Sequence, residues 1–432
     1  MIISRLGHLN VSRYLALTAL VIAGETIFLL PFVLSRIFRP VFLDVFAISN
    51  LQLGTAFSVY GIVAMISYFV GGPLADRFSA RTLLIIALLL TSLGGLVMAG
   101  IPSLAVLTLL YGYWGMTTIF LFWAALIKTT RQLGAGDQGQ AFGLLDGGRG
   151  LFVALLSSLS VAIFAALLPA EIETGSFQQS ASAFSTIILV FSVMGVLSAL
   201  LVWLFIPRPT HHAFVQSAPL PGMNLAGLKK VSAMPTVWLQ ALIILCAYVA
   251  YKSTDDFSLY ARDAFGYSDV DAVRLATVSF WMRPFAAIVA GLLADRFHGL
   301  LILKVSFILV MLGSGFIASG LLPGIPSLLV LSIAATSASI YALRGVYFAI
   351  FGEAKVPLAV TGSAVGIVSF IGFTPDIFMG PVMGYLIDRS PGATGHQHVF
   401  LLIAVFSLLG FLACLLFRRS SSSLSPVSAG QI

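Results

Sequence analysis

Charge is scarce in this sequence. Only 9% of the 432 residues are Asp, Glu, Lys or Arg, whereas 59% are hydrophobic, and the mean hydropathy is +1.04. A soluble domain carries about 25% charged residues, so the composition excludes a water-soluble fold. The apolar residues form runs of about 18 or more, each long enough to cross a hydrocarbon core as a helix. Alternating strands of about ten residues are missing, so the sequence predicts an all-α integral membrane protein.

Motifs for catalysis, for metal binding and for disulfide bonding are also missing. The two cysteines, Cys246 and Cys414, both fall inside apolar runs, which indicates neither a disulfide framework nor a metal site. Because no phosphate-binding loop, HExxH, CxxC or nucleophilic serine motif occurs, we expect no enzymatic activity, metal or cofactor. The net charge of +7 lies in short loops between apolar runs, which is typical of membrane topology and not of nucleic-acid binding. The first apolar run is too long for a signal peptide, and no cleavage site follows it.

What the sequence does contain is an internal repeat. The segment Gly72-Pro-Leu-Ala-Asp76-Arg77-Phe78 returns almost unchanged as Gly291-Leu-Leu-Ala-Asp295-Arg296-Phe297, 219 residues later. Gly100-Ile-Pro-Ser-Leu104 likewise returns as Gly324-Ile-Pro-Ser-Leu328. Because these echoes keep the same order and nearly the same offset, they indicate a duplicated unit of about half the chain.

The apolar runs predict six spans, a linker and six more spans. We expect residues 1–206 to form an N-terminal six-helix bundle, 207–234 a polar linker, 235–417 a C-terminal six-helix bundle and 418–432 a disordered, serine-rich tail. The predicted spans cover residues 15–37, 51–72, 82–100, 104–127, 140–168, 184–206, 236–260, 270–293, 300–322, 327–351, 360–386 and 398–417.

Lysine and arginine are divided unevenly between the two sides of the predicted spans. The richer side carries Arg5 and Arg13 before the first span, Lys229 and Lys230 in the linker, and several other basic loop residues. Basic loops mark the cytoplasmic side, so we expect both termini and the linker in the cytoplasm. An even number of spans agrees, and we expect a multi-pass protein of a bacterial inner membrane.

The sequence thus predicts twelve spans in two related halves, with G-x-L-A-D-R-F between spans 2 and 3 and again between spans 8 and 9. In this pattern the whole chain resembles the major facilitator superfamily. The resemblance implies a monomer of two pseudo-symmetric six-helix bundles that rock around a midplane site. It also implies that the two loops form a cytoplasmic latch, whose carboxylates cap a neighbouring helix start. The expected latch residues are Asp76, Arg77, Arg81, Asp295 and Arg296. Ser79 and Ala80 depart from the family pattern, and the alternative is a loop that only sets the topology.

Ionisable residues inside spans are costly, by ~2.5–3.5 kcal/mol each on insertion scales, and normally face a cavity or one another. Spans 3, 6 and 12 contain none in their interiors, and span 9 has only Lys304 near one end. We therefore expect these four spans to face lipid and the charged spans to line a central cavity. The residues concerned are Glu25, Asp146, Arg149, Lys252, Asp255, Asp256, Arg283, Arg344 and Asp376.

Helix geometry orders these charges by depth. At a rise of about 1.5 Å per residue, Glu25, Arg149 and Arg283 lie close to the midplane, where transporters of this kind bind substrate. Lys252 and Asp376 lie nearer the outer end, and Arg344 lies nearer the cytoplasm.

Two groups of charges share a helix face. Asp146 and Arg149, at positions i and i+3, either brace span 5 or form a pair in which Asp146 masks Arg149 until an anionic substrate replaces it. Lys252 shares a face with Asp255 or Asp256, and near the outer end these carboxylates can instead be solvated gating residues.

Arg283 has no carboxylate nearby on its own helix, which makes it the first choice for substrate contact. Glu25 precedes Pro31, which predicts a kink in span 1, and a buried carboxylate can carry a proton. Glu25, Asp146 and Asp376 are the candidates for proton coupling, although Glu25 can alternatively form a permanent salt bridge to Arg149 or Arg283. The aromatic residues expected in the cavity wall are Tyr60, Trp281 and Tyr347.

These features favour a secondary active transporter that takes up a small anionic or zwitterionic organic solute together with protons. Its expected substrate-binding cations are Arg149, Lys252, Arg283 and Arg344. The alternative is a proton-antiport exporter of drugs, metabolites or a chelator, which predicts a large apolar pocket with few fixed cations. A membrane receptor or scaffold would need additional soluble domains or long loops, and this sequence contains neither.

Overall fold

The computed structural model describes residues 11–134, 138–168, 177–207, 229, 231–321, 325–348, 350 and 361–423. The side chains of a few residues inside these ranges, including Asp76 and Asp295, are not described. Regular structure in the described ranges is entirely helical, and twelve segments are long and apolar enough to cross a membrane. The predicted all-α fold with twelve spans is therefore confirmed.

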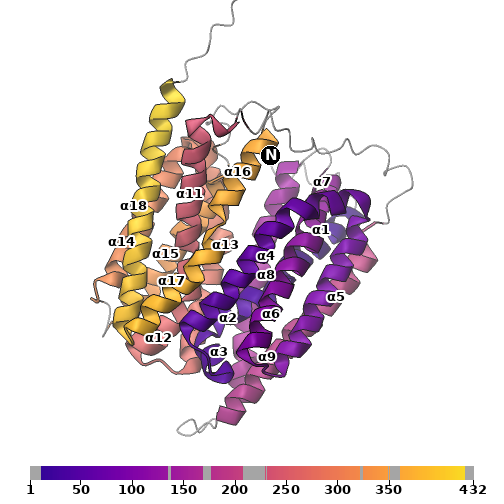
Figure 1. Cartoon of the computed structure of the whole chain (residues 1–432), viewed down its shortest axis with the longest axis vertical. Coiled ribbons are helices and arrows are strands. Elements are labelled where there is room, and N and C mark those ends of the chain that lie inside the picture. The colour runs from indigo at the N-terminus through magenta and orange to yellow at the C-terminus, as the bar shows by residue number, and fades with distance from the viewer. Residues whose placement is uncertain are drawn as a thin grey trace, which may run out of the picture.

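The N-terminal half contains the first six spans, drawn in indigo to magenta in Figure 1. Spans 1 and 4 are each built from several helical pieces, and the other four are single helices. The elements are α1 (Val11–Thr26), the π-helical turn η2 (Leu29–Val33), α2 (Leu34–Ile37), α3 (Arg39–Phe46), α4 (Asn50–Arg77), α5 (Ala80–Ala99), α6 (Leu104–Gly115), the π-helical η3 (Met116–Trp123), α7 (Ala124–Leu133), α8 (Gln138–Leu167) and α9 (Phe177–Phe205).

The C-terminal half contains the other six spans, drawn from red to yellow. Spans 7 and 11 are broken in this half. The elements are α11 (Pro235–Lys252), the 3-10 turn η5 (Ser253–Asp255), α12 (Phe257–Phe265), α13 (Asp269–Phe297), α14 (Gly299–Ala318), α15 (Pro326–Val346), α16 (Thr361–Gly372), α17 (Pro375–Arg389) and α18 (Ala393–Ser423). Because α18 continues to Ser423, the predicted start of the disordered tail at residue 418 is wrong.

The breaks in the spans have local causes. Pro31 lacks a backbone N–H and lies in η2, where the α-helical ladder of span 1 is interrupted. In span 11, the helix is interrupted between Gly372 and Pro375, because Pro375 has no backbone N–H to continue the helical ladder and its ring conflicts with the carbonyl of the preceding turn. The α-helix of span 7, α11, ends at Lys252, eight residues before the predicted end of the span, and the chain turns through η5 into the short helix α12.

The two halves meet at one end of the molecule. We call the end where α1 begins and α18 finishes the linker end, and the opposite end the far end. In Figure 1 the two bundles converge at the far end, around α2, α3 and α12, and diverge toward the linker end. Between the halves α4 packs against α17, α8 against α13, and α2 and α3 against α12.

Glycines allow the closest of these crossings. A Cβ atom on Gly54 of α4 would lie 2.2 Å from the carbonyl oxygen of Gly380 in α17, so the two backbones touch directly. On α8, a Cβ atom on Gly148 would meet Val21 of α1 at 2.9 Å, and one on Gly150 would meet Arg283 of α13 at 3.2 Å. Close helix contact in membranes depends on such small residues, because lipid supplies no hydrophobic force between helices.

Candidate substrate-binding site

A cavity of about 400 Å³ lies between the two halves. Its wall contains residues of α1, α2, α4, α7, α8, α11, α13, α15 and α17, whereas α5, α9, α14 and α18 contribute none of the lining residues described. This is the division between cavity-lining and outer spans that the distribution of charges predicts. The outer helices instead expose leucines, such as Leu197 on α9 and Leu312 on α14.

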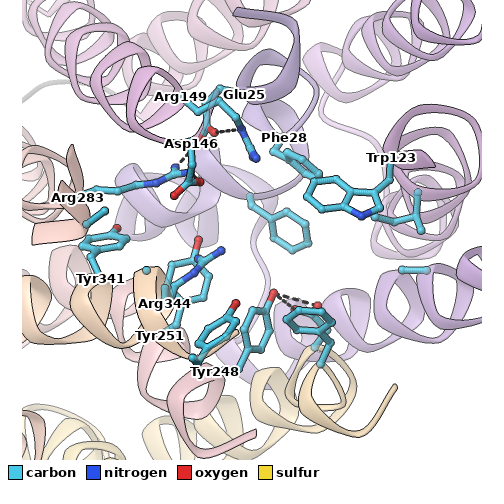
Figure 2. Close-up of a pocket in the computed structure, with 18 of the residues that line it drawn as sticks. Glu25, Phe28, Trp123, Asp146, Arg149, Tyr248, Tyr251, Arg283, Tyr341 and Arg344 are labelled. Carbon is cyan, nitrogen blue, oxygen red and sulfur yellow. Dashed lines mark hydrogen bonds and ion pairs between the residues drawn. The ribbon is translucent and has the colours of Figure 1, made fainter. Parts of the chain in front are cut away.

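Glu25 holds two arginines at mid-depth, and Figure 2 shows the three side chains together. Its Oε2 atom accepts a hydrogen bond from Arg149 Nε at 3.0 Å, and its Oε1 atom accepts one from Arg283 Nη1 at 2.9 Å. Arg283 Nη2 also lies 3.7 Å from Asp146, whose side chain is 59% exposed. We call Glu25, Asp146, Arg149 and Arg283 the Glu25 cluster. Since Arg283 belongs to the C-terminal half, the cluster joins the two halves.

The cluster differs from the predicted pairing in one respect. The expected intrahelical pair between Asp146 and Arg149 is absent from the described ion pairs, because Arg149 turns toward Glu25 while Asp146 approaches Arg283. The Arg149 guanidinium also lies 5.7 Å from the ring centroid of Phe28 and 6.0 Å from that of Trp123. Aromatic faces attract cations, so these rings help hold Arg149 at the cavity wall.

Lys252 pairs with Asp376 and not with its neighbours in sequence. Lys252 Nζ lies 2.6 Å from Asp376 Oδ1, and the Tyr248 hydroxyl donates to the same carboxylate at 3.1–3.2 Å. Of the two alternatives for this group, a pair between Lys252 and Asp255 or Asp256 is absent from the described ion pairs, because α11 ends at Lys252 and the 3-10 turn directs both aspartates elsewhere.

Asp255 contacts the other half of the molecule. It accepts a hydrogen bond at 2.5 Å from Arg36 of α2, which also donates to the Tyr251 hydroxyl at 2.6 Å. Both Arg36 and Asp255 are buried, so the pair closes the cavity toward the far end. Asp255 therefore lies at the junction of the halves, in the region expected for a gating residue.

Asp256 lies inside the C-terminal half, beside a histidine that the sequence prediction missed. His396 Nδ1 lies 2.7 Å from Asp256 Oδ2, and Nε2 lies 3.2 Å from Asp263 Oδ2. Partial burial raises the pKa of Asp263 and the hydrogen bond with His396 lowers it, with a net shift below the usual value. His396 escaped notice because α18 begins at Ala393, five residues before the predicted start of span 12.

Arg344 differs from the other cavity cations. Its guanidinium stacks 3.9 Å above the Tyr251 ring, as Figure 2 shows, and no carboxylate in the described part of the chain lies within 4.0 Å of it. The other four cations of the wall, Arg36, Arg149, Lys252 and Arg283, each have at least one carboxylate partner: Glu25, Asp146, Asp255 or Asp376. With every group ionised, the site therefore carries one uncompensated positive charge.

Two of the three predicted aromatic residues line the cavity. Tyr60 shares a 2.7 Å hydrogen bond with Thr118, and Tyr347 packs edge-on against Phe348. The prediction for Trp281 is wrong, because its indole lies outside the cavity lining and donates to Ser158 of α8 at 3.0 Å. Sequence periodicity did not separate the two faces of α13, since the residues around Trp281 are apolar on both.

The predicted latch loops lie at the linker end. The side chains of Asp76 and Asp295 lie outside the described residues, so their capping role stays a prediction. Arg77 and Arg296 are exposed, and Arg81 donates to the backbone carbonyl of Trp203 in its own half. In the described residues, no group of three His, Cys, Asp or Glu side chains could hold a metal ion.

The comparison with known families decides the identity of this fold. The sequence model of the Major Facilitator Superfamily matches residues 14–374. The chain belongs to the major facilitator superfamily. In this family member the cavity lies between the two homologous halves, and the chain is a multi-pass membrane protein of a transporter family.

Similar proteins cover almost the whole chain. The Escherichia coli K12 inner membrane protein YqcE is 26% identical over 95% of this chain and 96% of its own length, and inner membrane protein YihN of the same organism is 22% identical over 98% and 100%. Among solved structures, the nucleoside transporter NupG has a TM-score of 0.71 at 16% identity, covering 94% of this chain and 99% of its own. A bacterial homologue of the lysosomal transporter Spinster, inward-facing and occupied, has a TM-score of 0.66 at 16% identity over 97% and 100%. At such low identity these likenesses establish the fold alone.

Proposed function

We propose that the chain is a secondary active transporter that takes up a small anionic or zwitterionic organic solute together with a proton. The observation that carries this proposal is the unpaired guanidinium of Arg344 inside a cavity whose other cations already have carboxylate partners. A guanidinium in the cavity wall that has no carboxylate partner among the described residues favours the docking of an anionic group of the solute. Tyr60 and Tyr347 offer hydroxyl groups and aromatic faces to the rest of the solute.

The Glu25 cluster supplies a means of coupling. The Glu25 carboxylate forms ion pairs with both Arg149 and Arg283. A proton on Glu25 removes its negative charge and frees Arg149 and Arg283 to bind an anion, so proton binding and anion binding support each other. Asp376 can act in the same way, because its protonation would release Lys252. Asp146 is placed to repel an anion until its own charge is neutralised.

Alternating access follows from the arrangement of the halves. The ion pair between Arg36 and Asp255 and the glycine contact between α4 and α17 close the far end, whereas the bundles diverge toward the linker end. With both termini and the linker in the cytoplasm, as the loop charges predict, this is the inward-facing state. Residues of both halves of one chain line the cavity, which supports a monomeric transporter.

Uptake into proteoliposomes tests the proposal. A panel of small organic acids, amino acids and sugar acids would be offered under an inward proton gradient, with Arg344→Gln as the test variant. Arg274→Gln is the matched control, because Arg274 is an exposed arginine whose partner Asp271 lies on its own helix. We expect gradient-driven uptake that Arg344→Gln abolishes and Arg274→Gln retains. Accumulation only under the reverse gradient, with hydrophobic cations competing and Arg344→Gln fully active, would instead indicate an exporter.

A further inference from the structure

A carboxylate from one half caps a helix of the other half at the far end. Asp388, in the last turn of α17, accepts hydrogen bonds through Oδ1 from the backbone N–H and the side-chain Nδ2 of Asn50, both at 3.1 Å. Its Oδ2 atom accepts the backbone N–H of Leu51 at 2.8 Å. Asn50 and Leu51 are the first two residues of α4, where backbone N–H groups have no partner within the helix.

The backbone N–H groups at the start of α4 all have hydrogen-bond acceptors only because of this contact. Ser49 and Gln52 form a reciprocal capping box, in which each side chain accepts the backbone N–H of the other. Those two bonds use groups of the N-terminal half alone. The remaining N–H groups, on Asn50 and Leu51, depend on Asp388 of the C-terminal half.

The same contact continues into a buried polar network. The side-chain oxygen of Asn50 accepts hydrogen bonds from Arg39 at 2.9 and 3.1 Å, and Arg39 also donates to the backbone oxygen of Asp255 at 3.3 Å. Arg39 and Asn50 are 3% and 8% exposed. Asp388 is exposed and lies at the edge of this network. The buried members are favourable only while they are paired, so separation of the halves, which removes Asp388 and the Asp255 carbonyl as partners, is costly.

The sequence around Asp388 is a third copy of the latch motif. Gly384-Tyr-Leu-Ile-Asp388-Arg389 repeats the G-x-L-x-D-R pattern of the two linker-end loops, but at the opposite end of the molecule. A Cβ atom on Gly384 would lie 2.4 Å from the carbonyl oxygen of Asn50, so glycine is required for α17 to reach α4. The corresponding glycines of the other copies, Gly72 and Gly291, have no atom within 4 Å of such a Cβ. In this state the far-end copy is packed between the halves and the linker-end glycines are not.

We propose that Asp388 is the latch of the far end. It caps α4 from the opposite half while the far end is closed, and it releases the helix start when the halves separate there. Opening takes the carboxylate away from the N–H groups of Asn50 and Leu51, so the cap stabilises the closed far end relative to the open one.

Distance measurements between spin labels test this latch. In a chain with Cys246 and Cys414 replaced by alanine, one label pair at Ser103→Cys and Leu321→Cys reports the far end, and a second pair at Gln132→Cys and Leu301→Cys reports the linker end. In Asp388→Ala we expect the ratio of far-end-open to far-end-closed molecules to rise about tenfold, equivalent to ~1.4 kcal/mol. The linker-end distance should shorten in the same molecules.

Asp271→Asn is the matched control, because Asp271 is an exposed carboxylate at the far end whose ion-pair partner, Arg274, lies on the same helix. It should leave both distance distributions unchanged. A purely local role for Asp388 predicts a lower melting temperature in Asp388→Ala with both distributions as in the unmodified protein, and that result would overturn the proposal. If Asp388→Ala does not fold, the same distances are measured in Asp388→Asn. Distance distributions unchanged from the unmodified protein in Asp388→Asn would also overturn the latch proposal.

Discussion

Replacement of Glu25 by glutamine imitates its protonated form and separates anion binding from proton coupling. Glu25 accepts one hydrogen bond from each of Arg149 and Arg283, at 3.0 and 2.9 Å, and its side chain is 4% exposed. A hydrogen bond to a charged group contributes ~1.5–3 kcal/mol. An anion that takes Arg283 from Glu25 loses at least one such bond, whereas in Glu25→Gln it competes only with a neutral amide.

The variant should therefore bind the transported anion at least about tenfold more tightly, since ~1.4 kcal/mol corresponds to a factor of ten. The empty variant should be less stable, because two largely buried guanidinium groups lose a charged partner; access to the cavity limits the loss to ~1–3 kcal/mol. Added anion should restore more thermal stability to the variant than to the unmodified protein.

Proteoliposome assays distinguish the two functions. Counterflow, in which labelled substrate exchanges for unlabelled substrate without a gradient, should persist in Glu25→Gln, while accumulation driven by an imposed proton gradient should be lost. Glu25→Asp keeps the charge and should keep gradient-driven accumulation at a reduced rate. Undiminished accumulation in Glu25→Gln, or an anion affinity no higher than that of the unmodified protein, would refute the coupling role of Glu25.

Three further predictions concern other contacts. Lys252→Gln should destabilise the protein in thermal unfolding by ~3 kcal/mol, because it leaves Asp376 without its cation. The double variant Lys252→Gln/Asp376→Asn should recover most of this loss. Equal losses in the single and the double variant would contradict the pairing. Gly54→Ala should lower transport at least about tenfold, because its Cβ atom would overlap the Gly380 carbonyl at the α4–α17 crossing. Gly366→Ala, with open space at its Cβ, should have no effect on transport. Similar activity of the two variants would contradict the close crossing. His396→Ala should reduce the free energy of unfolding by ~3 kcal/mol, because it removes the partner of the fully buried Asp256; a melting temperature unchanged from the unmodified protein would show that the pair contributes nothing.

The spans and the cavity-lining set could be predicted because both depend on composition along one helix. A helix in lipid must be apolar over its whole length, so charges such as Glu25 and Arg283 mark the helices that face a cavity. The pairing of those charges could not be predicted, because it depends on how different helices are rotated. Lys252 and Asp376 lie 124 positions apart in sequence, yet their side chains are 2.6 Å apart.

Local helix geometry explains the remaining errors. Regular periodicity places Lys252 and Asp256 on one face, but the helix ends between them and the 3-10 turn rotates Asp256 toward His396. The π-helical turn around Pro31 similarly changes the rotation of Arg36 relative to Glu25. The third latch motif was visible in the sequence, but its meaning depended on the contact between Asp388 and α4 in the other half.

The unpaired charge of Arg344 has a consequence for transport across an energised membrane. A water-filled opening brings the site to the electrical potential of the side that it faces, so an empty carrier with one excess positive charge responds to voltage when it changes state. A full elementary charge corresponds to ~2.3 kcal/mol per 100 mV. If the linker end faces the cytoplasm, as the loop charges predict, a negative interior favours the conformation described above and opposes the return of the empty carrier. In the proposed cycle a singly charged anion and a proton bind together, so the loaded site keeps the same net charge. The membrane potential therefore favours the inward step of the loaded carrier as much as it opposes the return of the empty one, and the complete cycle moves no net charge.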